Sequence, residues 1–124
     1  MLHKIQEYTN LHIQERRAQC EDISQRRYMN EVEISELKAF IGLLFMAGFY
    51  RSNRQNLEDL WQADGSGVEV FRLTMSVQRF YFIQSSLRFD DKSTRAERQN
   101  LDNLAPVREI FEKFVEQCKK MYSP

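Results

Sequence analysis

The chain has 124 residues, of which 42% are hydrophobic and 29% are charged. That length fits one domain with a modest core, and the composition is that of an ordinary folded protein. Eighteen basic and eighteen acidic side chains cancel. A net charge of zero argues against a protein that binds polyanions with its whole surface, but a local basic face remains open.

Cysteine usage and hydropathy exclude further classes. Cys20 and Cys118 lie far apart without a metal-binding spacing, so neither a zinc site nor a disulfide framework is indicated. The amino terminus has no apolar stretch of the signal-peptide kind. The longest apolar run, AFIGLLFMAGFY, has 12 residues, well short of the ~20 that cross a bilayer. We therefore expect a reducing compartment, no contact with a membrane, and no bound metal, cofactor or small-molecule substrate.

The first predicted helix covers about Leu2 to Ala18, where apolar residues recur every three or four positions. His12 lies on its apolar stripe, a place where a single histidine is more typical of a boundary residue than of a ligand. The polar residues 21–33 that follow are expected to be irregular.

A second helix is predicted from about Glu36 to Phe49, with Ser35 as its N-cap. Its residues are apolar nearly all round, so we expect it to be the buried central helix. Gly42 and Gly48 within it would let a neighbouring helix approach closely, at about 1 kcal/mol each in helix propensity.

Shorter elements are predicted in the middle of the chain. Asn56 and Asp59 have the spacing of a capping box at the start of a short helix. The ADGSG stretch breaks the chain, and VEVFRLT predicts a short helix or a turn. Ser76 is expected to cap a helix over residues 77–87.

The polar stretch RFDDKSTRAERQNLDNLA, residues 88–105, is predicted to be a long connection. A strongly amphipathic helix follows, with Pro106 in its first turn, where a missing N–H costs nothing. The sequence thus predicts an all-α protein, a single helical domain of about five to six helices. Residues 1–30 would form an N-terminal helix and connection, and residues 31–124 the main helical unit.

The adjacent carboxylates Asp90 and Asp91 raise the question of catalysis. Two-metal chemistry needs carboxylates brought together from separate elements, whereas neighbours on a loop rarely aim at one point. No histidine or glycine-rich phosphate cradle lies close by, and no nucleophile motif occurs. We expect the pair to cap the next turn or to contact Arg88, Lys92 or Arg95, and we predict no catalytic residue.

Three stretches resemble the piggyBac-type transposases and their domesticated relatives: SELKAFIGLLFMAGFYR, SVQRFYFIQSSLRFDDKSTRAER and LAPVREIFEKFVEQCKKMYSP. The most specific part joins a DDK(S/T)xR motif to an (A/T)PVRxI(F/W) helix, in the order and at the spacing of that family. The resemblance covers residues 31–124 and is weaker before them.

This resemblance implies a mostly helical dimerisation and DNA-binding domain that acts in DNA transposition. In the family, an RNase H-like catalytic domain follows and supplies three aspartates that hold divalent metal for strand cleavage and joining. No residue of this chain matches those aspartates, or the ligands of the family's C-terminal zinc-binding domain. The resemblance therefore implies double-stranded DNA of transposon ends as the partner, a possible homodimer, a nuclear location and no cleavage by this chain.

Basic residues in and beside the DDK motif are the candidates for phosphate contact. They are Arg88, Lys92, Arg95, Arg98, Arg108, Lys119 and Lys120. Acidic residues interleave with them, so a solvated, salt-bridged surface is the alternative. A second basic set, Arg16, Arg17, Arg26 and Arg27, is expected to contribute less. If the first set meets phosphate, removing Arg95 and Arg98 together should weaken binding of any duplex and flatten its salt dependence.

Three functions fit these observations. The first is a transposase-derived module for DNA binding and dimerisation, and the second is a domesticated protein-interaction domain without cleavage activity. The third is the N-terminal part of an active transposase. The nine Phe, five Tyr and one Trp either fill the core or leave an exposed surface for self-association.

Overall fold

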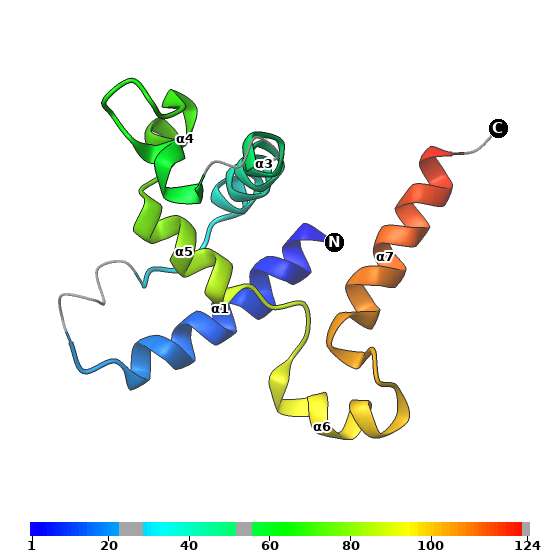
Figure 1. Cartoon of the computed structure of the whole chain (residues 1–124). Coiled ribbons are helices and arrows are strands. Elements are labelled where there is room, and N and C mark those ends of the chain that lie inside the picture. Colours follow the sequence, from blue (N-terminus) through cyan, green and yellow to red (C-terminus); the bar gives the residue numbers. More distant parts are fainter. Residues whose placement is uncertain (23–28, 52–55, 123–124) are drawn as a thin grey trace.

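The computed structural model describes residues 1–22, 29–51 and 56–122, and within them every regular element is a helix (Figure 1). The described part contains six α-helices: α1 (Leu2–Gln19), α3 (Ile34–Arg51), α4 (Glu69–Thr74), α5 (Val77–Ser86), α6 (Lys92–Leu101) and α7 (Ala105–Met121). A 3-10 helix, η1 (Leu57–Trp61), precedes α4. The prediction of a single all-α domain with about five to six helices is confirmed.

Helix α1 lies between the two ends of the fold. It packs on α3 and α5, while η1 contacts α3 and α4. Helices α6 and α7 form a separate pair. In Figure 1 the α4 end and the α6–α7 pair lie on opposite sides of α1, and α7 runs beside the amino-terminal half of the molecule.

The core lies where α1, α3, α4 and α5 meet. Phe40, Phe71 and Phe80 are fully buried there. The ring centroid of Phe80 is 5.0 Å from that of Phe40 and 5.1 Å from that of Trp61. Trp61 Nε1 donates a hydrogen bond to the Met75 carbonyl at 2.8 Å, so the polar atom of the indole is satisfied within the core.

Residues 29–33, which precede α3, are irregular, as predicted, but side chains fix them; residues 23–28 of the predicted irregular stretch lie outside the described part of the chain. Asn10 Oδ1 accepts from the Val32 N–H at 2.7 Å, and Asn10 Nδ2 donates to the Val32 carbonyl at 3.1 Å. Arg79 of α5 donates to both carboxylate oxygens of Glu36, at 2.9 and 2.7 Å. These contacts join α1, the start of α3 and α5 around residues 29–33.

Several predicted elements are confirmed. The first helix runs from Leu2 to Gln19, and residues 69–74 form a short helix. The Ser76 side chain accepts from the Arg79 N–H at 3.1 Å and so caps α5. Pro106 lies in the first turn of α7. Each of these predictions rested on a local signal, namely spacing, a capping residue or a proline.

The prediction of a long connection over residues 88–105 is wrong, because residues Lys92–Leu101 form α6. Asp91 is the N-cap of this helix, and its carboxylate accepts from the Ser93 N–H at 2.9 Å. None of the residues of α6 is buried. The helix therefore has no apolar stripe from which it could have been recognised.

The expectation that the central helix is buried nearly all round is also wrong. Leu37, Phe40 and Leu43 are buried on one face of α3, but Phe45 is 78% exposed and Phe49 is 71% exposed. Helix α3 lies at the edge of the fold, where α1 and η1 cover only part of its surface.

The starts of α3 and η1 and the surroundings of two glycines also differ from prediction. Helix α3 begins at Ile34, ahead of the predicted Ser35 cap. Asn56 precedes η1 but makes no side-chain cap hydrogen bond. A Cβ atom added at Gly42 or Gly48 would meet no described atom within 4 Å, so no helix approaches either glycine closely. In the described part of the chain, no helix has the length and apolarity needed to cross a membrane.

Candidate nucleic-acid interface

Asp90 binds two arginines of α6. Its side chain is 3% exposed, and it accepts hydrogen bonds from Arg95 Nε at 3.0 Å and from Arg95 Nη2 at 2.5 Å. Arg98 Nη2 donates to it at 2.9 Å. Burial raises the pKa of Asp90, but the hydrogen bonds and charges of Arg95 and Arg98 outweigh it and hold the pKa below its usual value. Asp90 is thus a buried anion with both oxygens occupied.

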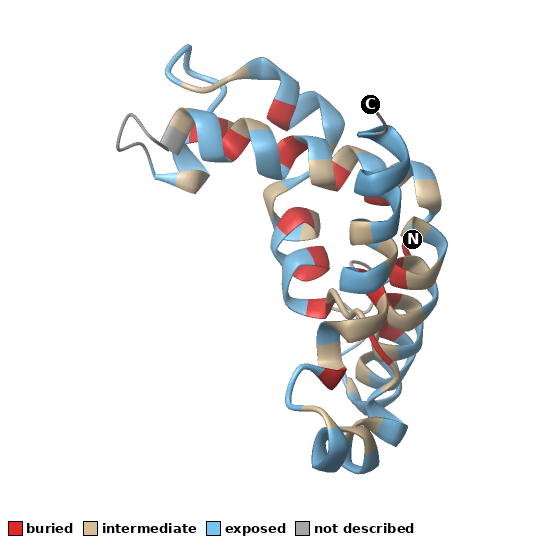
Figure 2. Ribbon diagram, turned by 90° about the vertical axis from the view of Figure 1, so that its right-hand side faces the viewer, coloured by how far each residue is buried: buried red, intermediate tan, exposed pale blue. Residues whose placement is uncertain are grey.

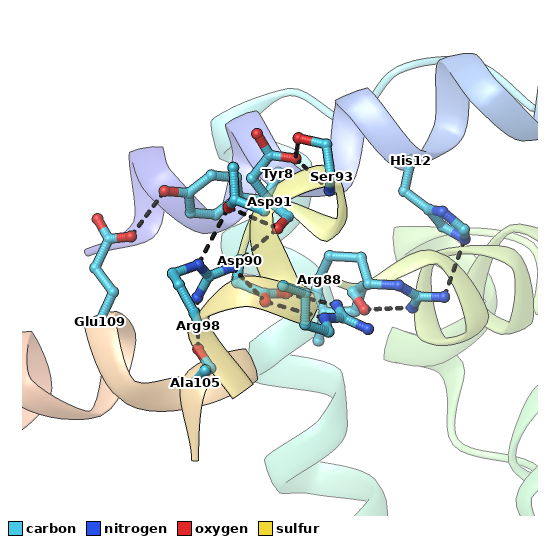
Figure 3. A network of polar contacts seen from close by, with 12 residues as sticks. Tyr8, His12, Arg88, Asp90, Asp91, Ser93, Arg98, Ala105 and Glu109 are labelled. Carbon is cyan, nitrogen blue, oxygen red and sulfur yellow. Dashed lines mark hydrogen bonds and ion pairs between the residues drawn. The ribbon is translucent and has the colours of Figure 1, made fainter. Parts of the chain in front are cut away.

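Arg98 joins the DDKSTR stretch to the beginning of the APVREIF stretch. Besides Asp90, its guanidinium donates to the Asp91 carbonyl and to the Ala105 carbonyl, each at 2.9 Å. Ala105 is the first residue of α7. Figure 3 shows Arg98 between Asp90 and Ala105. One side chain therefore connects the DDK stretch, α6 and the beginning of the APVR helix.

Asp91 serves as a helix cap. Its Oδ1 accepts from the Ser93 N–H at 2.9 Å and from Ser93 Oγ at 2.7 Å. These hydrogen bonds, first that of the side chain and then that of the backbone, lower the pKa of Asp91. The expectation that the acidic pair caps a turn and contacts Arg95 is confirmed. The second partner of Asp90 is Arg98, which that expectation did not name.

A hollow of about 400 Å³ opens between α1, α6 and α7, lined by Asp90, Asp91, Asp102, Glu109 and Glu112 together with Arg98 and Arg108. Its acidic side chains are largely engaged by internal donors. Arg108, for example, donates to both oxygens of Asp102 at 2.8 and 3.0 Å, and this contact lowers the pKa of Asp102 to about 2. No group of three potential metal ligands occurs among residues 1–22, 29–51 and 56–122.

The basic residues predicted to contact phosphate fall into two groups. Arg95 and Arg98 are paired with Asp90, and Arg108 is paired with Asp102. The charge of Arg108 is therefore compensated within the chain, whereas Arg95 and Arg98 share one carboxylate, so their cluster keeps one positive charge. Substitution of Arg95 and Arg98 would also leave Asp90 buried without partners, so a loss of DNA binding in that double variant would not by itself identify a phosphate contact.

Four candidates remain: Arg88, Lys92, Lys119 and Lys120. Of these, only Lys120 forms an ion pair within the described part of the chain. Lys92 and Lys119 are exposed, and Lys120 contacts Glu116 at 3.0 Å on an exposed turn of α7. The Arg88 guanidinium donates to the carbonyls of Ser85 at 3.3 Å and Leu87 at 2.7 Å. Of the second basic set, Arg26 and Arg27 lie outside the described residues.

His12 is a further neighbour of the Arg88 guanidinium. Its Nε2 lies 3.0 Å from Arg88 Nη2. Because a guanidinium nitrogen can only donate, His12 Nε2 must be the acceptor, which places the proton of the neutral ring on Nδ1. Burial lowers the pKa of His12, and the nearby charges of Arg88, Arg16 and Lys92 lower it further. A positive field therefore exists around this histidine.

The family of the chain follows from a match over its whole length. All 124 residues of the chain match the family model described as Transposase IS4. The chain belongs to this transposase family. No curated protein and no solved structure matches it. Membership of the transposase IS4 family confirms the predicted relationship to transposases at that coarser level.

Helix α7 of this transposase IS4 family member carries an apolar stripe that the described chain leaves open. Val107 is 41% exposed, Phe111 54% and Phe114 52%, while Met121 and Tyr122 are almost fully exposed. Only Ala105 and Ile110 of α7 are buried. Figure 2 shows α7 mostly in the colours of exposed and intermediate residues.

Helix α7 is connected to α1 by a hydrogen bond between Tyr8 and Glu109. Tyr8 Oη donates to Glu109 at 2.7 Å, as Figure 3 shows. This hydrogen bond, with burial and the Glu109 charge, raises the pKa of Tyr8 to about 12. The same bond, together with Lys113, lowers the pKa of Glu109 against the opposing effect of burial.

Replacing Tyr8 with phenylalanine should lower the free energy of unfolding by about 1 kcal/mol at pH 7, because a part-buried hydrogen bond to a charged acceptor is lost. The folded-state pKa of Glu109 is depressed. Its stabilising effect is therefore present above the unfolded pKa and is lost as pH falls through the folded value. The difference between Tyr8→Phe and wild type should shrink below about pH 4.

Urea unfolding of both proteins at several pH values measures this difference. Tyr122→Phe is the matched control, because Tyr122 is 90% exposed; its stability should equal that of the wild type. A Tyr8→Phe protein as stable as the wild type at pH 7 would show that the α1–α7 hydrogen bond does not stabilise the fold.

Proposed function

We propose that this transposase IS4 family member is the helical DNA-binding and dimerisation module of a piggyBac-type transposase, and that it acts in the nucleus. The family match over residues 1–124 carries the proposal. The Arg98 contacts support its finer part, because they connect the DDK and APVR stretches of the piggyBac resemblance into one hydrogen-bonded unit.

The module holds DNA and does not cut it. Both carboxylates of the DDK motif have structural partners: Asp90 binds Arg95 and Arg98, and Asp91 caps α6. A carboxylate so engaged would have to give up charged hydrogen bonds in order to bind a metal ion. No residue of the sequence matches the catalytic aspartates of the piggyBac family.

Incubation of the purified chain with Mg²⁺ and a labelled transposon-end duplex tests this proposal. The duplex should be retained in a gel-shift experiment and should remain uncut. A scrambled duplex of the same length should also bind, because phosphate contacts do not depend on sequence. Magnesium-dependent nicking by the purified chain would refute the non-cleaving role, and failure to retain either duplex would refute the DNA-binding role.

Self-association through α7 accounts for its exposed apolar stripe. The exposed side chains of Leu104, Val107, Phe111, Phe114, Cys118 and Met121 recur at intervals of three and four residues, the spacing of a helix-pairing seam. With Tyr122 they present on the order of 800 Å², about the area that each partner buries in a stable dimer. This surface fits a second copy of the chain.

The Phe111→Ser/Phe114→Ser variant should therefore be monomeric where the wild type is dimeric, as measured by size exclusion with light scattering. Both side chains are about half exposed, so the monomer fold should persist, which circular dichroism can verify. A wild type that stays monomeric at every accessible concentration would contradict the dimer. The same surface would then favour the alternative function, a domesticated protein-interaction domain.

A further inference from the structure

In the part of the chain that the structure describes, three positive side chains around His12 have no carboxylate within ion-pair distance. Arg16 Nη1 donates to Ser85 Oγ at 2.9 Å and to Ser86 Oγ at 2.6 Å, and its guanidinium lies 4.9 Å from the centroid of the Phe82 ring. Arg88 donates to carbonyls and to His12. Lys92 is exposed. All these neighbours are neutral, so the three charges are not compensated by contact.

Four other arginines in the described part of the chain form ion pairs shorter than 3 Å with carboxylates. Arg79 is paired with Glu36, Arg95 and Arg98 with Asp90, and Arg108 with Asp102. Around Arg16, Arg88, Lys92 and His12, the only carboxylate within ion-pair distance in the described part of the chain is Glu15, 3.9 Å from His12 Nδ1. Arg16 and Arg88, which both donate to Ser85, thus lie close together without a carboxylate partner in the described part of the chain.

Helix α5 adjoins Arg16 and Arg88, and it carries no acidic residue. Its sequence is VQRFYFIQSS, and Gln78, Tyr81, Gln84 and Ser85 are exposed. With Arg16 and Phe82 they line a shallow hollow between α1 and α5. Arg88 adjoins it, because its guanidinium donates to the carbonyl of Ser85 at 3.3 Å.

The side chains of this region are chemically complementary to the surface of a nucleic acid. Guanidinium and ammonium groups bind phosphates, and glutamine amides can both donate to and accept from the polar edges of bases without adding charge. Duplex DNA also supplies the dense negative charge that three uncompensated cations favour. An acidic neighbour on α5 would oppose such a partner, and α5 has none.

We propose that the α1–α5 surface, formed by Arg16, Gln78, Gln84, Arg88 and Lys92, is the face of the chain that binds duplex DNA. The inference rests on the proposed DNA-binding function and names its surface. Arg16 and the α5 glutamines were not among the residues that the sequence favoured for phosphate contact. Arg16 and Arg88 are held in place by α5 and the turn that follows it, so the cations are positioned before DNA arrives.

The test replaces glutamine with glutamate, which keeps the size of the side chain and adds one negative charge. Gln78→Glu/Gln84→Glu places two such charges on the α1–α5 surface. The matched control is Gln99→Glu/Gln117→Glu, which adds the same charge at exposed positions on α6 and α7. All four side chains are exposed, so both proteins should unfold at the same urea concentration as the wild type.

The probe is a fluorescein-labelled duplex of mixed sequence, titrated with each 124-residue protein by fluorescence anisotropy. Gln78→Glu/Gln84→Glu should bind it at least about tenfold more weakly than the control variant at low salt. Arg16→Ala/Lys92→Ala should lower the slope of log K against log salt by about two, one for each lost phosphate contact.

The outcomes separate this inference from the function on which it rests. A wild type that does not bind the duplex overturns the DNA-binding function itself. A wild type that binds, with equal losses in the two glutamate variants and an unchanged salt slope for Arg16→Ala/Lys92→Ala, overturns the α1–α5 surface alone. Competition by polyglutamate as strong as that by unlabelled duplex, compared at equal charge, would likewise overturn it in favour of an acidic protein partner.

Discussion

The Asp90→Asn variant should have a free energy of unfolding about 2–3 kcal/mol below that of the wild type at pH 7. Asparagine keeps the volume of the side chain but removes its charge and presents an amide N–H₂ toward Arg95 or Arg98. The Asp90 side chain is 3% exposed, so water cannot replace the lost partner. Arg95 and Arg98 are 26% and 38% exposed, which keeps the loss below that of a fully buried pair.

Asp91→Asn is the control, because it makes the same chemical change one residue away. Asparagine caps a helix about as well as aspartate, so the stability of this variant should differ from that of the wild type by less than about 0.5 kcal/mol. Urea unfolding followed by circular dichroism measures both. Equal stabilities for Asp90→Asn and Asp91→Asn would show that the contacts of Asp90 with Arg95 and Arg98 do not stabilise the fold.

The pH dependence of stability provides a second check on Asp90. Its pKa is lower in the folded than in the unfolded chain. The stabilisation is therefore complete above the unfolded pKa of about 3.9 and is lost as pH falls through the folded value. Between neutral pH and about pH 3 the wild type should lose more stability than Asp90→Asn, which has no carboxylate at this position to protonate.

The Phe80→Ala variant should lose about 3–5 kcal/mol, the largest effect of any single truncation considered for this chain. The Phe80 ring is fully buried and contacts the rings of both Phe40 and Trp61. Its removal leaves a cavity between α3, α5 and η1 that these rigid aromatic neighbours cannot fill. For a domain of this size such a loss is a large part of the total stability.

Phe45→Ala is the comparison, because it removes the same side chain from an exposed position on α3. Phe45 is 78% exposed, so its truncation should change the free energy of unfolding by less than about 0.5 kcal/mol. Urea denaturation of the two variants measures the difference. A Phe80→Ala protein as stable as Phe45→Ala would place the core elsewhere.

The fold could be predicted from sequence where the signal was local. The apolar spacing of α1, the Ser76 cap of α5 and Pro106 at the start of α7 each identify a helix without knowledge of its neighbours. Helix α6 could not be predicted, because it buries no residue and its stability comes from the Asp91 cap and from arginines that contact Asp90. The capping sequence DDKS was the one available signal.

The candidate site could be predicted only in part, because the charge of a residue in sequence is not its charge in the fold. Arg95 and Arg98 lie in a basic stretch, yet both contact one buried carboxylate, which balances one of their two positive charges. Arg16 lies beside Glu15 in sequence, yet within the described residues it donates to two serine hydroxyls and lies over the ring of Phe82. Tertiary pairing decides which cations are available, and a linear pattern does not report it.

The apolar stripe of α7 and the α1–α5 surface are held in place by different contacts. The Asp90 cluster connects α6 to α7 and fixes the position of the apolar stripe. Arg88, two residues before Asp90, belongs to the α1–α5 surface, and its backbone N–H donates to Thr9 Oγ1 of α1 at 3.1 Å. One segment of chain therefore joins the face proposed for DNA to the face proposed for a second copy.

The most direct measurement of the central claim is the affinity of the purified chain for a labelled duplex at about 50, 100 and 200 mM salt, with Mg²⁺ present and the strands examined afterwards. A protein that positions DNA through uncompensated cations should bind more tightly as salt falls, with a slope of at least about −2, and should leave both strands intact. Binding that ignores salt, or strands that are cut, would contradict it.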